Sequence, residues 1–214
     1  MRTHGWQGDP PASDKDACQR IIAATKRCVE RQGLRHTGFS DVAAELGVTR
    51  ATVYRYFRNI GDLLKATTLT AAGEFLDRLV DQIAPVTDPG EALIEAMAFT
   101  IEELPREPFV GVLMEVSADP GVIEDLFSPL SVAFARATLE RFPVDWREHG
   151  YGPDDMAGLA EYLLRLLHSF LPEPGRPAVP GDPRPFLRRW VLPAFAAQSR
   201  PVAGADGRSR AEPV

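Results

Sequence analysis

The chain has 214 residues, of which 44% are hydrophobic and 25% are charged. This length suits one domain or two small ones and allows a substantial buried core. The net charge of −6 at pH 7 argues against nucleic-acid binding by the chain as a whole. The charge is uneven, however: residues 1–65 carry 11 Lys and Arg against 7 Asp and Glu, giving +4, and residues 66–214 carry 13 against 23, giving −10. A positive potential is therefore localised in the N-terminal part.

The cysteines and the hydropathy pattern indicate a cytoplasmic protein. Cys18 and Cys28 fall in one predicted helix, ten residues apart. That spacing separates them by about 15 Å, which is too far for a disulfide, so we expect reduced thiols. The N-terminus lacks the apolar core of a signal peptide, and no apolar run approaches the roughly 20 residues that span a bilayer. We therefore expect no signal peptide and no membrane partner.

The N-terminal third predicts an arm and three helices. Residues 1–12, which include Gly, Pro and Trp6, predict a flexible arm. Ser13 and Asp16 form a capping box for a helix that reaches about Gln32. Two short helices follow, over about 39–46 and 50–57. The first has a one-sided apolar stripe formed by Val42, Ala43 and Leu46. Gly47 follows and ends this helix, and Thr49 caps the start of the second helix.

The second short helix has two different faces. Val53 and Phe57 continue the apolar stripe, and the opposite face carries polar and aromatic side chains: Arg50, Thr52, Tyr54, Arg55 and Tyr56. Two short helices joined by a tight turn form a helix-turn-helix, whose second helix can enter the major groove of DNA. An ordinary solvated face is the alternative for any one of these residues, but the ordered set favours DNA binding.

The rest of the chain also predicts helices, and no strand pattern stands out. Asn59 and Asp62 cap a long helix over about 61–84, and Asp88-Pro89 opens a helix to about Leu104. A further helical segment is predicted over about 108–117, and two more pieces follow it, the second of which ends near Phe142. The last two predicted helices cover about 154–171 and 184–197. We predict an all-α fold with a helix-turn-helix domain at 13–60, a helical effector-binding and dimerisation domain at 61–198, and a disordered tail at 199–214.

The first third resembles the TetR family of transcriptional regulators. The resemblance rests on Asp41-Val42-Ala43, Gly47-Val48-Thr49, Thr52-Val53-Tyr54, Tyr56-Phe57 and Leu63-Leu64, with Arg20-Ile21-Ile22, Ala24 and Gly33 upstream. Two positions depart from the family pattern. Ile60 stands where the family usually has a lysine, and Gly38 stands where a Ser or Thr usually caps the second helix. One phosphate contact is thereby missing, for which Arg58 or Lys65 can compensate.

The resemblance and the helix position assign roles on DNA. Arg50 suits a bidentate contact with guanine, and Ala51 suits contact with a thymine methyl. The resemblance implies that Thr52, Tyr54 and Tyr56 bind phosphates, and Ser40 can do so at a helix N-terminus. With Thr49, Arg55 and Arg58, these residues form the expected DNA-binding set. The expected partner is double-stranded DNA with a palindromic operator.

The last two predicted helices indicate a homodimer. Apolar residues nearly encircle the helix over about 154–171, and a second broad stripe follows over about 184–197. Two such helices from each subunit would form a symmetric bundle. The alternative is that both helices only complete the core of a monomer.

The resemblance also implies an effector cavity in the helical domain. The candidate residues are mostly apolar, which indicates a small hydrophobic effector: Phe75, Leu79, Met97, Phe99, Ile101, Phe109, Leu113, Met114, Glu115, Phe134, Leu163 and Arg165. Plain core packing is the alternative for each apolar residue. For Arg165 the alternative is a surface ion pair with Glu161, four residues earlier.

An enzyme is the competing class of function, and the sequence disfavours it. The four histidines are scattered, with no Cys or His cluster at zinc spacing. No Gly-rich phosphate loop or nucleophile motif is found either. We expect no cofactor and no metal. The function predicted is a ligand-responsive repressor released from its operator by the effector. The alternative is a helical small-molecule-binding or scaffold protein with weakened DNA binding.

Overall fold

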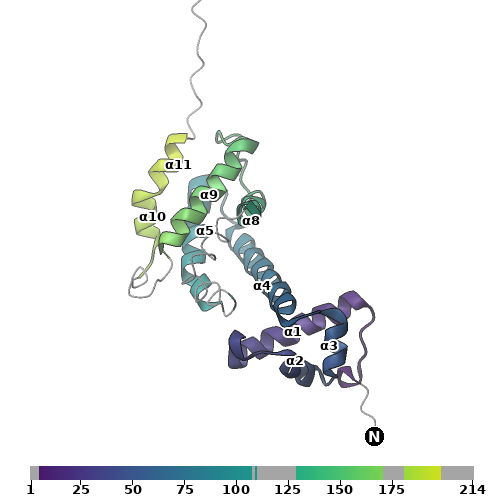
Figure 1. Cartoon of the computed structure of the whole chain (residues 1–214). Coiled ribbons are helices and arrows are strands. Elements are labelled where there is room, and N and C mark those ends of the chain that lie inside the picture. The colour runs from purple at the N-terminus through teal and green to yellow at the C-terminus, as the bar shows by residue number, and fades with distance from the viewer. Residues whose placement is uncertain (1–4, 108, 110–128, 171–180, 199–214) are drawn as a thin grey trace, which may run out of the picture.

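The computed structural model describes residues 5–107, 109, 129–170 and 181–198, and every regular element in these ranges is a helix. Figure 1 shows two groups of helices connected by the long helix α4 (Ile60–Ile83). We call the N-terminal group the head; it contains η1 (Trp6–Gly8), α1 (Asp14–Gln32), η2 (Leu34–His36), α2 (Phe39–Leu46) and α3 (Arg50–Tyr56). We call the other group the body; it contains α5 (Pro89–Glu103), η3 (Leu104–Arg106), α8 (Pro129–Leu139), α9 (Pro153–Phe170), α10 (Arg184–Trp190) and α11 (Leu192–Gln198).

Side-chain caps fix the starts of four helices. In each, the side chain of the cap residue accepts a hydrogen bond from the backbone N–H three residues later, which satisfies one of the free donors of the first turn. The cap residues are Ser13, Thr49, Asn59 and Asp88, with distances of 3.1, 3.2, 2.8 and 2.8 Å. All four were predicted from the sequence, and Pro89 follows Asp88 at the first helical position.

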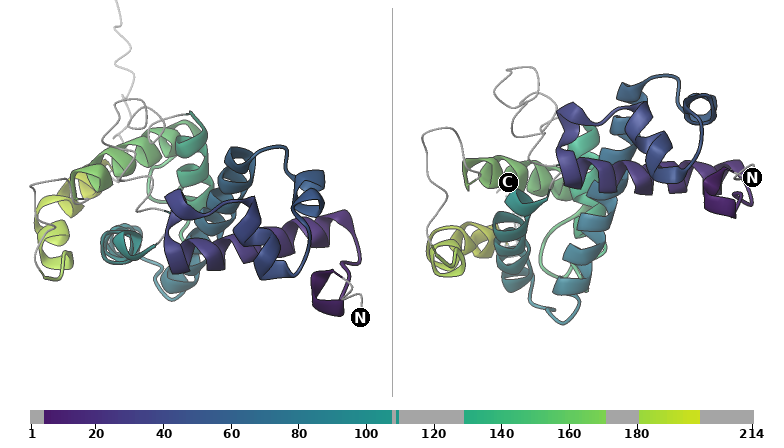
Figure 2. Two further views of the ribbon diagram at one scale, coloured as in Figure 1. Left: turned by 60° about the horizontal axis from the view of Figure 1, so that its bottom comes forward. Right: turned by 90° about the horizontal axis from the view of Figure 1, so that it is seen from below.

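The head has its own hydrophobic core. It gathers buried residues from α1 to α3 and from the first turns of α4: Ile21, Ala24, Cys28, Phe39, Val42, Ala43, Leu46, Val53 and Leu63. Both views of Figure 2 show α1, α2 and α3 packed together near one end of α4. Because α4 supplies Leu63 to this core, the head and the long helix are joined by packing and not by a linker.

The body core is separate. It contains the end of α4, most of α5, and buried residues of α9, α10 and α11, including Ile83, Leu93, Met97, Leu159, Leu187 and Phe195. The indole N–H of Trp146, in the connection between α8 and α9, donates to the Leu139 carbonyl at 2.9 Å. Two arginines of α10 also bind α5 from outside: Arg184 pairs with Glu95 at 2.7 Å, and Arg188 pairs with Glu91 at 2.7 Å.

The structure corrects the last predicted helix. Residues 184–197 were expected to form one helix, but α10 ends at Trp190 and α11 begins at Leu192. Pro193 explains the break, because it has no N–H to donate to the carbonyl of residue 189 and its ring crowds that carbonyl. The apolar pattern continues across the break, so hydrophobic spacing alone predicted a continuous helix.

Several predictions lie outside the described residues. These are the helix over about 108–117, the tail at 199–214 and most of the loop at 172–183. Within the described ranges, Cys18 and Cys28 are both free thiols. No helix in these ranges combines the length and apolar character needed to cross a bilayer.

Candidate nucleic-acid interface

The turn between α2 and α3 sets the direction of the second helix. Gly47 has φ 65° and ψ 31°, in the left-handed region that favours glycine. In this conformation the N–H groups of Gly47 and Val48 donate to the carbonyls of Ala44 and Ala43, at 3.1 and 2.9 Å. These bonds satisfy the last carbonyls of α2. Thr49 then starts α3, so the predicted helix-turn-helix geometry is present.

The two faces of α3 differ as the sequence predicted. Val53 is fully buried in the head core, and Phe57 is half-buried against it. On the opposite face, Arg50, Ala51 and Arg55 are exposed, and Tyr54 keeps 45% of its surface accessible. A helix whose polar face is open in this way can approach another molecule without unfolding any part of the head.

Arg50 and Tyr54 form the first of two arginine–tyrosine pairs on α3. The Arg50 guanidinium lies over the Tyr54 ring, 5.7 Å from its centroid, and Nη2 donates to the Tyr54 hydroxyl at 3.2 Å. The Tyr54 ring also meets Phe39 in an edge contact, with centroids 4.4 Å apart and planes at 66°. Phe39 is the first residue of α2 and is buried. A series of three side chains in contact therefore leads from the core to solvent.

Arg55 and Tyr56 form the second pair. The Arg55 guanidinium lies 4.6 Å from the Tyr56 ring centroid and donates a hydrogen bond to its hydroxyl. Trp6 contacts the Tyr56 ring edge-on, with centroids 6.4 Å apart. Gln7 fixes the same segment by donating from Nε2 to the Glu45 carbonyl at 3.1 Å. Residues 5–8 of the predicted flexible arm are therefore packed on the head.

The start of α2 shows the consequence of a glycine cap. Gly38 has no side chain to accept a hydrogen bond from the first turn, whereas its own N–H donates to the Asp41 carboxylate at 2.8 Å. That hydrogen bond from Gly38 is the main reason that the pKa of Asp41 is lowered. Ser40 is exposed in the same turn, and Ile60 is half-buried against the head core. Because Gly38 stands in place of the usual Ser or Thr, only half of a capping box is present.

Three acidic residues of the head, Asp9, Asp16 and Glu45, pair with arginines that do not belong to α3. Glu45 pairs with Arg27 at 2.8 Å and with Arg31 at 3.1 Å, and the pKa of Glu45 is lowered by these hydrogen bonds. Arg20 pairs with Asp9 and Asp16, both at 3.0 Å. In the part of the chain that the structure describes, no carboxylate pairs with the arginines of this surface, which are Arg50, Arg55 and Arg58. These cations remain available for phosphates.

Comparison with known proteins agrees with this geometry. Residues 21–67 match the family model of bacterial regulatory proteins of the tetR family. The chain is also 26% identical, over 187 residues, to an uncharacterized HTH-type transcriptional regulator found in two strains of Mycobacterium tuberculosis, covering 86% of this chain and 87% of the relative. The head is therefore a DNA-binding domain of the TetR family, and the chain as a whole is similar to transcriptional regulators. Members of this family are DNA-binding regulators and not enzymes.

The likeness of this chain to a solved structure extends over the whole fold. The TetR family repressor AlkX from Dietzia sp. strain DQ12-45-1b, implicated in biodegradation of n-alkanes, superposes with a TM-score of 0.58. The match covers 90% of this chain and 100% of AlkX, at 19% sequence identity. The all-α fold with a helix-turn-helix head and a helical body is therefore that of the family.

The predicted effector residues lie in different environments. Leu113, Met114 and Glu115 fall outside the described residues. The buried or half-buried members are Phe75, Leu79, Met97, Phe99, Ile101 and Leu163. Phe134 is 48% exposed on α8, and Arg165 is exposed on α9, where it pairs with Glu161 at 2.5 Å. Phe109 packs with Val29 of α1 and Ala71 of α4. It therefore lies beside the head.

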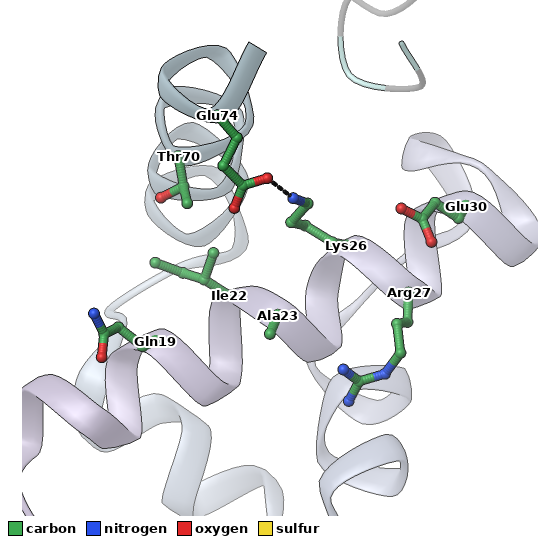
Figure 3. A pocket seen from close by; sticks show the side chains of 8 residues that line it. All are labelled: Gln19, Ile22, Ala23, Lys26, Arg27, Glu30, Thr70 and Glu74. Atoms are coloured by element: carbon green, nitrogen blue, oxygen red, sulfur yellow. Dashed lines mark hydrogen bonds and ion pairs between the residues drawn. The ribbon is translucent and has the colours of Figure 1, made fainter. Parts of the chain in front are cut away.

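Two hollows lie elsewhere in the described part of the chain. One lies between α1 and α4, where Lys26 and Glu74 point toward each other and form an ion pair (Figure 3). The second lies at the connection of α8 and α9, beside Trp146 and Tyr151. Neither is lined by a residue from the predicted effector set, so the cavity stays a prediction.

Sequence reasoning missed the aromatic residues behind the two tyrosines. Phe39 was not singled out, and Trp6 was placed in a flexible arm, because neither belongs to α3. The ion pairs between α5 and α10 were missed as well. Glu91 and Glu95 are four residues apart, as are Arg184 and Arg188, and this matching spacing of opposite charges was a usable signal.

Proposed function

We propose that α3 reads a palindromic operator in duplex DNA, with one half-site for each subunit of a homodimer. The carrying observation is the exposed face of α3, where Arg50, Tyr54 and Arg55 are open to solvent. Arg50 is the first residue of α3, and recognition helices meet base edges near their N-termini. A bidentate contact with guanine suits its guanidinium, and Ala51 beside it suits a thymine methyl.

Other polar groups on and near α3 serve as phosphate ligands. Thr52 and Tyr56 are half-buried and follow the reading positions on α3, and Arg58 is exposed two residues after the helix. Ser40 lies in the first turn of α2, whose free N–H groups favour an anion. These contacts set the register of the protein on DNA, whereas Arg50 and Ala51 supply base preference.

Fluorescence anisotropy with a duplex selected from a randomised pool tests this function. The affinity should fall steeply with salt, because phosphate contacts release counterions. Arg50→Ala should relax preference at one base pair of each half-site, and Tyr56→Phe should weaken binding to all duplexes alike. Failure of the wild-type protein to bind any duplex at low salt would favour a helical small-molecule-binding or scaffold protein instead.

The proposed dimer uses α9 with α10 and α11. This part of the surface exposes large aromatic side chains, with Tyr162 43%, Phe186 47% and Trp190 63% accessible. Ring contacts join the helices, since Phe170 meets Phe186 at 5.6 Å and Tyr162 meets Phe195 at 5.7 Å. A gathered apolar surface of this kind marks a protein–protein contact, and a second copy would cover it symmetrically. Light scattering that gave the monomer mass of 23.5 kDa at micromolar concentration would contradict the dimer.

The proposed effector is a small hydrophobic molecule held in the body next to α4. Support comes from the apolar contact of α4 with α5, where Phe75 and Phe99 meet at 5.5 Å. The same helix supplies Leu63 to the head core and Ile83 to the body core. A molecule that binds one arrangement of α4 better than another weakens operator binding by its difference in affinity, and no more.

Release of the operator by the effector makes the protein a repressor that works in the cytoplasm. A thermal-shift screen tests the effector class. Hydrophobic and aromatic compounds should raise the melting temperature and should lower affinity for the selected duplex. If only charged metabolites raise the melting temperature, the effector class is wrong, whereas the DNA-binding role is unaffected.

A further inference from the structure

Tyr54 contacts a buried aromatic residue, Phe39, and also an exposed arginine, Arg50. Phe39 is 6% exposed and presses against the Tyr54 ring at a centroid distance of 4.4 Å. Phe39 is itself fixed, because it starts α2 and belongs to the head core. The orientation of the Tyr54 ring is therefore set by the core of the head, although almost half of the residue's surface is exposed.

The Tyr54 hydroxyl in turn restricts the Arg50 guanidinium. Arg50 Nη2 donates to this hydroxyl at 3.2 Å, and the guanidinium lies 5.7 Å from the ring centroid. The two residues are four apart on one helix, so their side chains share a face. Among the described residues, no carboxylate competes for this guanidinium. A neutral hydroxyl restrains the arginine without neutralising it.

We propose that Tyr54 is a positioning residue that orders Arg50 for base reading, with Phe39 as its support. The proposal rests on the proposed role of Arg50 as the base-reading residue. A free arginine must give up many rotamers when it binds a base, and a restraint present before binding reduces that loss. Base preference at one position is therefore encoded by three residues, of which only Arg50 needs to touch the base.

The hydroxyl can also couple the base contact to the phosphate backbone. A tyrosine hydroxyl has one proton to donate and accepts hydrogen bonds as well. In this structure it accepts from Arg50, which leaves its own proton for a phosphate oxygen. A backbone contact by Tyr54 would then hold Arg50 in register with the base pair, in place of two independent contacts.

The second arginine–tyrosine pair provides a matched control on the same helix. Arg55 also lies over a tyrosine ring and donates to its hydroxyl, and Trp6 takes the place of Phe39. This pair lies at the C-terminal end of α3, where phosphate contacts are expected. Removal of the Tyr56 hydroxyl should leave base preference unchanged.

The test is a double-mutant cycle read as base preference. The full-length protein and its Arg50→Ala, Tyr54→Phe, combined and Tyr56→Phe variants are titrated against three kinds of duplex: the duplex selected by the wild-type protein, its single base-pair substitutions, and a scrambled sequence. Arg50→Ala should reduce preference at one base pair by about tenfold or more. Tyr54→Phe should reduce preference at that same base pair by about two- to tenfold, the range for one hydrogen bond. In the Arg50→Ala background, Tyr54→Phe should cause no further loss of preference.

Three results would overturn the proposal. If Tyr54→Phe weakens all duplexes equally and keeps base preference, Tyr54 is only a phosphate ligand. If Tyr54→Phe strengthens specific binding, the hydroxyl restrains Arg50 in an unproductive position. If Arg50→Ala leaves base preference intact, the reading role of Arg50 fails, and with it the positioning role. The first two results leave the proposed function standing.

Phe39→Leu provides a second measurement. Leucine keeps most of the buried volume but loses the ring contact with Tyr54. Preference at the Arg50 base pair should fall by about twofold to fivefold, while the melting temperature reports any loss of folding separately. A folded Phe39→Leu protein with full base preference would show that Phe39 does not support Tyr54.

Discussion

The head and the body of this regulator are both helical, but they are specified over different distances along the chain. The head core uses residues from Ile21 to Leu63, and α1 and α3 begin at side-chain caps close by in the sequence. The body core draws on residues from Leu79 to Phe195 and is reinforced by ion pairs between α5 and α10. The proposed DNA-reading surface therefore belongs to a locally encoded unit, whereas the proposed effector site and dimer surface depend on contacts between distant segments.

The largest expected effect comes from a substitution on the proposed dimer surface of the body, which leaves the head unchanged. Trp190→Glu places a charge on the most exposed aromatic residue of the α9–α10 surface. The protein should become a monomer by light scattering, since a buried unpaired charge opposes association. Its affinity for a palindromic duplex should fall by about a hundredfold or more, because the two heads no longer bind as a linked pair.

Leu69→Glu is the matched control for Trp190→Glu. Leu69 is also an exposed apolar residue, 47% accessible, but it lies on α4. This variant should keep the dimer mass and the operator affinity. A monomeric Leu69→Glu protein, or a dimeric Trp190→Glu protein, would place the dimer surface elsewhere.

Shortening one buried side chain in each core should show whether the head and the body unfold separately. Leu63 in the head and Leu187 in the body are both fully buried, so each change to alanine should cost about 2–5 kcal/mol of unfolding free energy. Hydrogen exchange should show faster opening of α1 to α3 for Leu63→Ala, and of α5, α9 and α10 for Leu187→Ala. Identical exchange patterns for both variants would show that the head and the body unfold as one.

Acid should destabilise the head through three carboxyl groups whose pKa values are lowered. The causes are the Ala12 N–H for Asp16, the Gly38 N–H for Asp41 and the Arg27 side chain for Glu45. Their ionised forms stabilise the folded head fully above the ordinary carboxyl pKa of about 4, and this contribution is lost as pH falls through the lowered values. Circular-dichroism melts between about pH 6 and pH 3 measure the loss. Asp41→Asn should flatten this pH dependence, and an unchanged profile would argue against the Asp41 contribution.

The smallest expected effect is a gain in unfolding free energy when Gly38, which precedes α2, is replaced by serine. Gly38→Ser supplies the missing hydroxyl at the start of α2, and a Cβ there would meet the Asp41 carboxylate at an ordinary 3.5 Å. The head should gain a few tenths of a kcal/mol in unfolding free energy. Gly38→Ala fills the same space without an acceptor and should give no gain. Equal melting temperatures for the serine and alanine variants would show that the cap is not limiting.

The head was predictable because its signals are local. Gly47 and the caps Thr49 and Asn59 mark helix ends directly, and the observed bounds of α2, α3 and α4 differ from the predicted ones by at most one residue. The exposed face of α3 followed from helical spacing in the same way. The supports behind that face were not predictable, because Phe39 and Trp6 reach it only after the head has folded.

The body was predicted less completely. Helix positions followed from apolar spacing and proline boundaries, but the break at Pro193 was overlooked because the apolar pattern runs through it. The effector residues were chosen by residue type, and type does not distinguish a cavity wall from core. Phe109 illustrates this limit, since it packs between α1 and α4 beside the head. Cavities arise from how several helices meet, which no short segment encodes.

The placement of the three tryptophans has an experimental consequence. Trp6 contacts the reading helix, Trp146 is buried in the body, and Trp190 lies on the proposed dimer surface. Phenylalanine at any two of these positions leaves a single tryptophan, whose emission can be excited selectively over that of the four tyrosines. Three such proteins would report operator binding, effector binding and subunit association as separate emission changes, without attached dyes.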